Sequence, residues 1–453
     1  MDIMALLSVL SQSVDQTTIK RLSEIATAMI TMSGRVTMLG LSRWTEQGGS
    51  YRTIQRFYNS TIPWGLAMWL FFRAHLYQTG AEYLLIGDES VITKAGKETH
   101  GLDRFFSSLF GKPVAGLAFF ALSLVNVGQR KSYPLLVEQV IRTEAEKQAA
   151  QQKKAQKQLK QRKSSTKKGK VGRPKGSGNK NKRQIEWTPE LRRVEQMAAT
   201  LIKRVGWLCA LRYFVLDGHF GHNNVLQMVR QILGLHLICK LRHDAALYFL
   251  YDGQQKSQGR KRIYGAKIDY DHLPAKYLVR STSHEGIRTD IYQATLLHKS
   301  FADRLNVVII LKTNLSSGKR GHVILFSSDL DLAYDKLIDY YQLRFQIEFN
   351  FRDAKQFWGF EDFMNVNPTP VTNAVGLAFF MVNLSQALLA PFRLRQPEFS
   401  ILDLKAHFRA RRYARETLKL LPLPPDPIFI DHVLLNIQPL GSIHPLPSNP
   451  PPT

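Results

Sequence analysis

The stretch from residue 212 to 241 alternates strand, acidic residue, helix and strand, and this order restricts the fold more than any other part of the chain. Residues 213–216 form a short apolar run typical of a buried strand, and the run ends in Asp217. Residues 223–233 have the spacing of an amphipathic helix, and 235–241 form a second apolar run. This alternation predicts an α/β sheet.

A second strand-rich region lies upstream, at residues 83–86, 115–127 and 133–140. These runs are rich in Val, Phe and Leu, which favours a three-stranded meander. The first run is followed by Asp88. We therefore expect Asp88 at the end of the first strand, just as Asp217 is expected at the end of a later one.

Residues 144–183 hold 12 Lys and 3 Arg against 2 Glu, a surplus that supplies half of the formal net charge of +26. Such a composition cannot bury a core, so we predict a flexible basic arm. Within it, Arg173, Pro174 and Lys175 resemble the centre of an AT-hook, in which an extended Arg-Pro segment lies in the minor groove of A·T-rich DNA. The alternative is a solvated run of charge that contacts phosphates without any groove preference.

The first 80 residues have the apolar spacing of helices, and a Gly-rich turn before residue 51 precedes a segment with Arg52 and Arg56 on one side. This pattern fits a helix-turn-helix that reads DNA, and equally a helical bundle with a solvated basic face. The net charge indicates a polyanionic partner. Nucleic acid is the commonest such partner, and an anionic membrane surface is the alternative.

The segment 341–355 contains no Pro or Gly, so we predict one helix there. At about 100° per residue, one edge of this helix carries four polar side chains, namely those of Tyr341, Arg344, Glu348 and Lys355. Burying such groups without partners is costly, and a DNA phosphate and a divalent metal would be suitable partners. The alternative is an ordinary amphipathic helix with an Arg344–Glu348 ion pair.

Metal-dependent phosphoryl transfer on DNA needs about three carboxylates gathered at one point. Two acids at strand ends, Asp88 and Asp217, would meet the helical Glu348 on one edge of a sheet in a ribonuclease-H-like arrangement. Taken singly, each Asp is equally well explained as a turn or cap residue. Their joint occurrence with Glu348 favours a catalytic site.

Four residues of the helical segment resemble, in order and spacing, the Y-(2)-R-(3)-E-(6)-K signature of IS4-type insertion-sequence transposases: Tyr341, Arg344, Glu348 and Lys355. The segments around Asp88 and Asp217 resemble the first and second acidic regions of that family. The resemblance covers roughly residues 80–390.

The resemblance implies a DDE transposase that cleaves double-stranded DNA at terminal inverted repeats and transfers the freed 3′-hydroxyl into target DNA. It implies that Asp88, Asp217 and Glu348 are catalytic and bind two Mg²⁺ (or Mn²⁺) ions. The DNA-binding residues would be Tyr341, Arg344 and Lys355, with Arg173 and Lys175 of the arm. Bringing two ends together implies a homodimer. The alternatives are a metal-dependent nuclease that cuts DNA without joining it, and a DNA-binding relative that has lost catalysis.

These observations predict a ribonuclease-H-like α/β protein divided as follows: 1–80, helical DNA-binding region; 81–143 and 187–242, two parts of the catalytic domain; 144–186, basic arm; 243–335, β-rich insertion; 336–420, catalytic helix and C-terminal helices; 421–453, Pro-rich tail, expected to be mostly unstructured.

The apolar run 374–390 is interrupted by polar residues, which favours a buried helix over a membrane span. Cys209 and Cys239 are expected to be reduced core residues. We expect a cytoplasmic, nucleoid-associated prokaryotic protein that does not enter a membrane.

Overall fold

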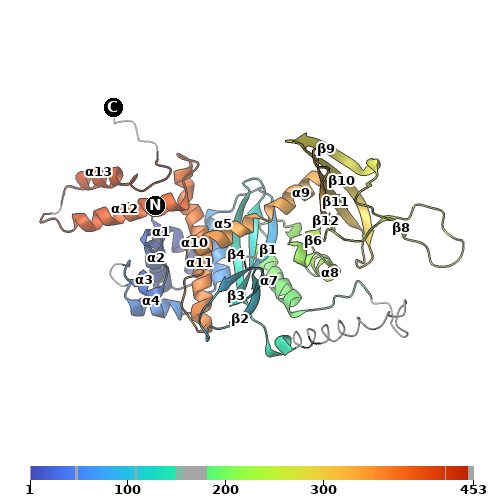
Figure 1. Cartoon of the computed structure of the whole chain (residues 1–453). Helices are drawn as coiled ribbons and strands as arrows, with labels where there is room; N and C mark the ends of the chain where they lie inside the picture. The colour runs from blue at the N-terminus through green and yellow to red at the C-terminus, as the bar shows by residue number, and fades with distance from the viewer. Residues whose placement is uncertain are drawn as a thin grey trace.

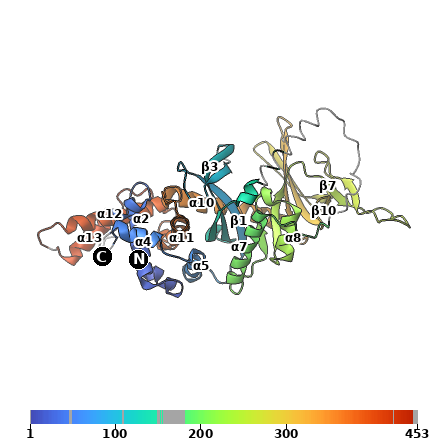
Figure 2. The same ribbon diagram turned by 90° about the horizontal axis from the view of Figure 1, so that it is seen from below.

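A computed structural model describes residues 2–45, 49–107, 110–148, 152, 155, 181–423 and 425–446 of the chain. Within these residues the fold is mixed α/β with one large mixed sheet, as predicted. Helices from both ends of the chain gather at one end of an elongated molecule, and the last strands lie at the other (Figures 1 and 2). Arg173 and Lys175 of the predicted arm lie outside the described residues.

Helices occupy the described part of the first 80 residues: α1 (Ile3–Leu7), a 3₁₀ turn (Ser8–Gln12), α2 (Gln16–Thr31), α3 (Met38–Ser42), α4 (Tyr51–Tyr58) and α5 (Trp64–His75). The side chain of Ser50 caps α4 by accepting a hydrogen bond from the Thr53 N–H. This helix buries Ile54 and Phe57 and leaves Arg52 and Arg56 exposed.

The first half of the sheet contains β1 (Tyr83–Thr93), β2 (Asp103–Ser107), β3 (Lys112–Asn126), β4 (Lys131–Val140), β5 (Tyr213–Val215) and β6 (His236–Leu241). The predicted three-stranded meander is confirmed as antiparallel β1, β3 and β4, and the short β2 also pairs with β3. The prediction that Asp88 ends its strand is wrong, because Asp88 lies inside β1. The reason is that β3 pairs with β1 along its whole length, from Tyr83 to Thr93, so hydrogen bonding continues past the acidic residue.

The order of the strands defines the centre of the molecule. Antiparallel β4, β3 and β1 are followed by β5 and β6, which run parallel to β1. The crossovers carry α7 (Pro189–Val205) and α8 (Asn223–Gln231), and the predicted helix at 223–233 is confirmed. Figure 1 places α7 and α8 on the opposite side of these strands from the late helices α10 and α11.

The strand-rich region 243–335 extends the same sheet. It contains β7 (Leu247–Leu250), β8 (Tyr264–Lys267), β9 (Leu278–His284), β10 (Ile287–His298), β11 (Leu305–Asn314) and β12 (Arg320–Ser327). β12 pairs antiparallel with β6, and β11, β10 and then β7 and β9 follow. Backbone hydrogen bonds therefore join this region and the central strands into one sheet.

The late helices are α9 (Tyr334–Leu343), α10 (Gln346–Phe357), α11 (Pro368–Arg393), α12 (Ile401–Leu418) and α13 (Pro427–Ile437). By length and composition alone, α11 could cross a membrane, but 78% of its apolar window is buried inside the protein. Its polar Asn383 donates to the carbonyl of Pro134 on β4 at 2.7 Å. The run 374–390 therefore lies in a core helix, as predicted. Cys209 and Cys239 are also buried and free.

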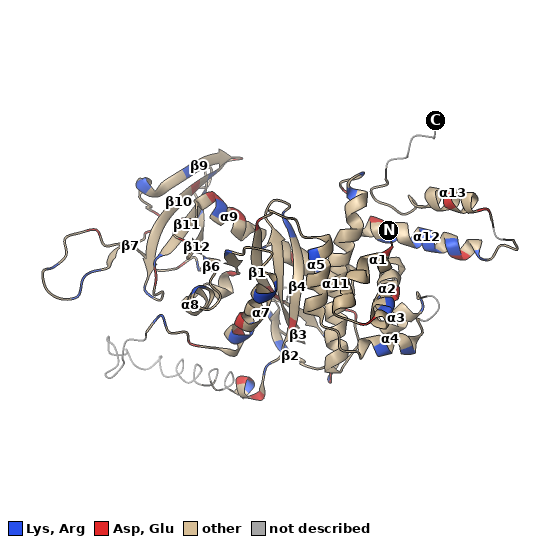
Figure 3. Cartoon of the chain, turned by 180° about the vertical axis from the view of Figure 1, so that it is seen from behind, with Lys and Arg blue, Asp and Glu red and all other residues tan. Residues whose placement is uncertain are grey.

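The helix α12 contacts both an N-terminal helix, α2, and the C-terminal helix α13. Lys405 and Arg409 donate to the carbonyls of Met29, Thr31 and Met32, where cations stabilise the C-terminal end of α2. The tail is not unstructured throughout, because Asp426 and Pro427 begin α13, which lies against α12 and buries Leu434. Figure 3 shows Lys and Arg, in blue, on α4, α7 and α12.

Candidate active site

Asp88 and Asp217 emerge on the same edge of the sheet. β1 and β5 are parallel, and the last residues in register are Ile86 and Val215. Each acid lies two residues beyond that pair, and two residues is the period with which side chains return to one face of a strand. β5 stops there whereas β1 continues, so the space beside Asp88 is open on the side of Asp217.

The turn after β5 holds Asp217 in place. Its carboxylate accepts a hydrogen bond from the His219 N–H at 3.2 Å and so caps a short 3₁₀ helix. A Cβ on Gly221 would lie 2.3 Å from the carbonyl oxygen of Lys240, so this close turn requires glycine. Because β6 runs parallel to β5 with Val215 opposite Ile238, Lys240 comes to lie beside Asp217.

The predicted single helix over 341–355 is wrong. α9 ends at Leu343 and α10 begins at Gln346. Between them, the N–H groups of residues 344, 345, 347 and 348 each donate to the carbonyl three residues earlier, at 3.0–3.2 Å. This is the tighter 3₁₀ winding, which changes the direction of side chains before and after it. No Pro or Gly causes the change, and it coincides with the residue that binds across to the sheet, Arg344.

Arg344 bridges two of the three predicted catalytic acids. Its Nη1 lies 2.8 Å from Asp88 Oδ2, and its Nη2 lies 3.1 Å from Glu348 Oε1. The Arg344 and Asp88 side chains are only 16% and 21% exposed, so the pair is shielded from water. The Arg344–Glu348 ion pair that the sequence left open as an alternative is therefore present, but it is joined by a second pair that holds α10 against β1.

Negative charge is crowded at this edge. Burial, with the added repulsion of Asp217 and Glu348, raises the pKa of Asp88 to about 6, against the opposing attraction of Arg344. A carboxyl group whose ionised form is this disfavoured gains most from a nearby cation. The arrangement is thus chemically suited to bind a cation, and Arg344 supplies only part of the charge needed.

Replacing Asp88 with Asn is expected to stabilise the metal-free protein at alkaline pH. The pKa of Asp88 is raised on folding, so its favourable contribution is full below about pH 4 and is lost as pH rises through 6. At pH 8 the free energy of unfolding of the variant should therefore exceed that of the parent protein by about 3 kcal/mol, and at pH 4 most of this difference should be gone. Urea unfolding in a chelator measures both, with Asp252→Asn in an exposed loop as the control. A pH-independent difference would contradict this prediction.

Two further predicted residues lie close to the acids. Tyr341, at the end of α9, lines an open cavity of about 480 Å³ together with Asp217 and Arg344. Burial raises the pKa of Tyr341 to about 12, so the phenol stays neutral at physiological pH. Lys355 lies farther along α10, with its Nζ 3.2 Å from Glu361 Oε1. It also approaches the carbonyl of Val91, three residues beyond Asp88 on β1.

The same cavity contains basic residues that the sequence reasoning missed: Lys240, Arg242, His243 and His322. Lys240 lies near the end of the strand predicted at 235–241, and Arg242 and His243 directly follow that strand. This cluster of basic residues at the strand end was the available signal. His322 comes from β12, and only the pairing of β12 with β6 brings it there. The described lining of the cavity therefore has one acidic residue, Asp217, and several basic residues.

The family model described as DDE superfamily endonuclease matches residues 9–300, nearly two thirds of the chain, and the chain belongs to this family. Membership makes the protein a DDE-type nuclease or transposase whose substrate is DNA. The matched residues contain Asp88 and Asp217, whereas Glu348 follows them in the sequence. No curated protein matches the chain.

Proposed function

We propose that this protein is a DNA transposase of the IS4 type, which cleaves at terminal inverted repeats and joins the freed 3′-hydroxyl to target DNA. One observation carries the proposal: the parallel register of β1 and β5 sets Asp88 and Asp217 on one sheet edge, and Arg344 ties Glu348 to that edge. The order of β4, β3, β1, β5 and β6 supports a ribonuclease-H-like catalytic core.

Asp88, Asp217 and Glu348 would hold two Mg²⁺ or Mn²⁺ ions. Their carboxylate oxygens are the donors that such hard cations prefer, and the raised pKa of Asp88 indicates a need for added positive charge. Among the described residues, no group of three His, Cys, Asp or Glu side chains already stands at metal-binding spacing. The Arg344 guanidinium lies between Asp88 and Glu348, so it must move before the three carboxylates can approach one metal-binding point. When bound, the ions would activate the attacking water or 3′-hydroxyl and stabilise the leaving oxygen.

The remaining site residues would handle the DNA backbone. Tyr341 and Arg344 flank the cavity, and a phosphate entering it would draw Arg344 from the carboxylates, since guanidinium and phosphate form strong paired hydrogen bonds. Lys240 and Arg242, which line the same cavity, would contact phosphates of the DNA strand that lie farther from the acids. Lys355 would leave its ion pair with Glu361 and bind a DNA phosphate instead.

Other parts of the chain would contribute to DNA binding and assembly. The exposed Arg52 and Arg56 of α4 support a DNA-binding role for the N-terminal helices. Arg173 and Lys175 would add charge from the arm. Two copies would pair in the synaptic complex, in the cytoplasm of a prokaryotic cell at the nucleoid.

Product analysis tests the proposal directly. The purified protein is incubated with Mg²⁺, a target plasmid and a duplex that carries the repeats flanking its own gene. We expect 3′ ends of the duplex covalently joined to the plasmid, detected by sequencing across the new junctions, and none with a duplex of scrambled ends. Cleavage without any junction would overturn the transposase proposal and identify a nuclease instead.

A further inference from the structure

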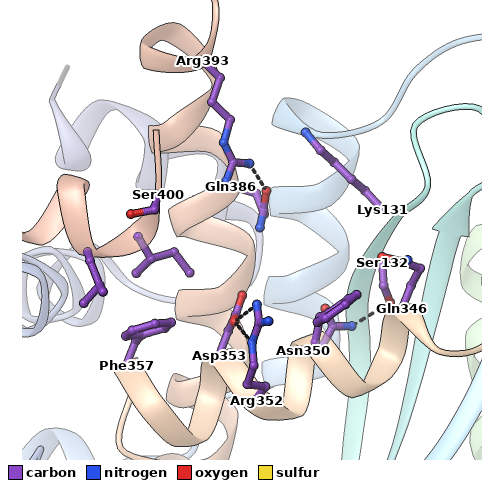
Figure 4. Close-up of a pocket in the computed structure, with 13 residues that line it drawn as sticks. Lys131, Ser132, Gln346, Asn350, Arg352, Asp353, Phe357, Gln386, Arg393 and Ser400 are labelled. Atoms are coloured by element: carbon purple, nitrogen blue, oxygen red, sulfur yellow. Dashed lines mark hydrogen bonds and ion pairs between the residues drawn. The ribbon is translucent and has the colours of Figure 1, made fainter. Parts of the chain in front are cut away.

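A second cavity lies behind α10, on the face of the helix that turns away from Glu348. Its volume is about 300 Å³, and it is enclosed by α10, the start of β4, the end of α11 and the start of α12. Figure 4 shows Lys131, Arg393 and Asp353 approaching it from three of these elements. None of the three proposed catalytic acids lines it, so it is separate from the acidic cleft, which is the site around Asp88, Asp217 and Glu348.

Positive charge exceeds negative charge in the lining. The charged lining residues are Lys131, Arg352, Arg393 and Asp353. Asp353 is buried, and its Oδ1 accepts from both Nε and Nη2 of Arg352, at 3.0 and 2.9 Å. Because the only acidic residue among the described residues of the lining, Asp353, pairs with Arg352, the positive charges of Lys131 and Arg393 are not fully neutralised within the lining.

Both of these cations are short of anionic partners. Arg393 donates to neutral acceptors, the carbonyl of Phe399 at 3.0 Å and Gln386 Oε1 at 3.2 Å, and it shares the field of Asp353. Within the described part of the chain, the Lys131 ammonium makes no hydrogen bond or ion pair. Burial, and then the nearby Arg393, lower the pKa of Lys131. Lys131 is exposed at the start of β4 and Arg393 is half-buried at the end of α11. Two like charges that line one cavity favour a bound anion.

The rest of the lining suits a phosphate ester better than a simple ion. Ser132 Oγ accepts from Asn350 Nδ2 at 2.7 Å, which leaves the hydroxyl proton free to donate to a ligand. Phe349 and Phe357 provide aromatic surface, and the Arg352 guanidinium lies 4.6 Å from the centre of the Phe349 ring. Cations beside rings are the groups that bind a phosphate with an attached planar base.

We propose that this cavity binds a phosphate ester, with Lys131 and Arg393 on the phosphate and the Phe349 ring beside the group it carries. The ligand is either a free nucleotide or one nucleotide of a DNA strand, because both present the same chemistry. The proposal goes beyond the transposase function, since it needs none of the residues of the acidic cleft.

Calorimetric titration of the full-length protein tests the site, in a chelator and at physiological ionic strength so that metals and loose surface binding do not contribute. The probes are inorganic phosphate, a deoxynucleoside monophosphate and a single-stranded oligonucleotide. We expect saturable binding of the monophosphate and about a tenfold rise in its Kd in Lys131→Gln, as for loss of one charged hydrogen bond. Lys131→Arg should restore binding. Lys336→Gln, which removes an exposed cation of α9, should leave the Kd unchanged.

Further arms separate the sources and set the limits of the proposal. Displacement of the monophosphate by the oligonucleotide identifies a DNA strand as the ligand, and displacement only by free nucleotides identifies a small molecule. Absence of saturable binding, or equal binding by the parent and Lys131→Gln, would overturn the site. Equal affinity for phosphate and monophosphate, unaltered by Phe349→Ala, would overturn the assignment of an ester.

Discussion

Replacing Glu348 with Gln is expected to lower the rate of DNA cleavage about a thousandfold, which corresponds to roughly 4 kcal/mol of transition-state stabilisation. The substitution keeps the size of the side chain and an oxygen that can accept from Arg344. It removes the negative charge with which Glu348 would hold a metal ion next to Asp88. The loss should therefore appear in the chemical step, as measured by single-turnover cleavage of a labelled repeat-end duplex at saturating Mg²⁺.

Binding measurements distinguish this effect from misfolding. In a chelator, Glu348→Gln should bind the same duplex as tightly as the parent, or slightly more tightly because one carboxylate no longer faces the phosphates. Glu398→Gln, at an exposed position outside the cavity, is the matched control and should cleave normally. Cleavage by Glu348→Gln within about tenfold of the parent rate would exclude Glu348 from the catalytic set.

Replacing Phe379 with Ala is expected to destabilise the protein by about 3–5 kcal/mol, the usual loss for a large aromatic side chain in a close-packed core. Phe379 is fully buried on α11. Its ring centre lies 5.5 Å from that of Phe351 on α10 and 5.2 Å from that of Phe360 just beyond α10. The cavity left behind would remove the support on which α10, and with it Glu348, rests against the sheet.

Urea unfolding followed by circular dichroism measures this loss. Phe429→Ala on α13 is the control, because that ring is 51% exposed and its removal should change stability by no more than about 0.5 kcal/mol. A cost below about 1 kcal/mol for Phe379→Ala would mean that α11 does not support α10.

Local pattern predicted the regular elements well where one physical requirement dominated. The helix expected from residue 223 is present as α8, and the region expected to be β-rich, 243–335, contains β7 to β12. Each is amphipathic or bounded by turn residues, so its own side chains specify its burial. The apolar run 374–390 likewise had to be covered by other parts of the protein, and 78% of the apolar window of α11 is buried.

Prediction was wrong where a distant partner decides the outcome. β1 continues past Asp88 because β3 offers it hydrogen bonds up to Thr93, and no residue near Asp88 encodes that partner. The helix over 341–355 is interrupted where Arg344 binds across to Asp88, 256 residues earlier. His322 enters the cavity only through the pairing of β12 with β6. In each case the deciding contact is remote in sequence.

By itself, the sequence determined that the chain forms an α/β sheet, which acids could serve phosphoryl transfer, and which polar residues share a short segment with Glu348. These properties follow from side-chain chemistry and from spacing along one element. The sequence also predicted that Asp88 and Asp217 share a sheet edge, and the register of β1 and β5 places them there. The tertiary structure alone decided that Arg344 stands between Asp88 and Glu348 and that a second, cationic cavity lies behind α10. Those outcomes depend on strand register and helix packing, which are set by the free energy of burying whole surfaces against each other rather than by any one segment.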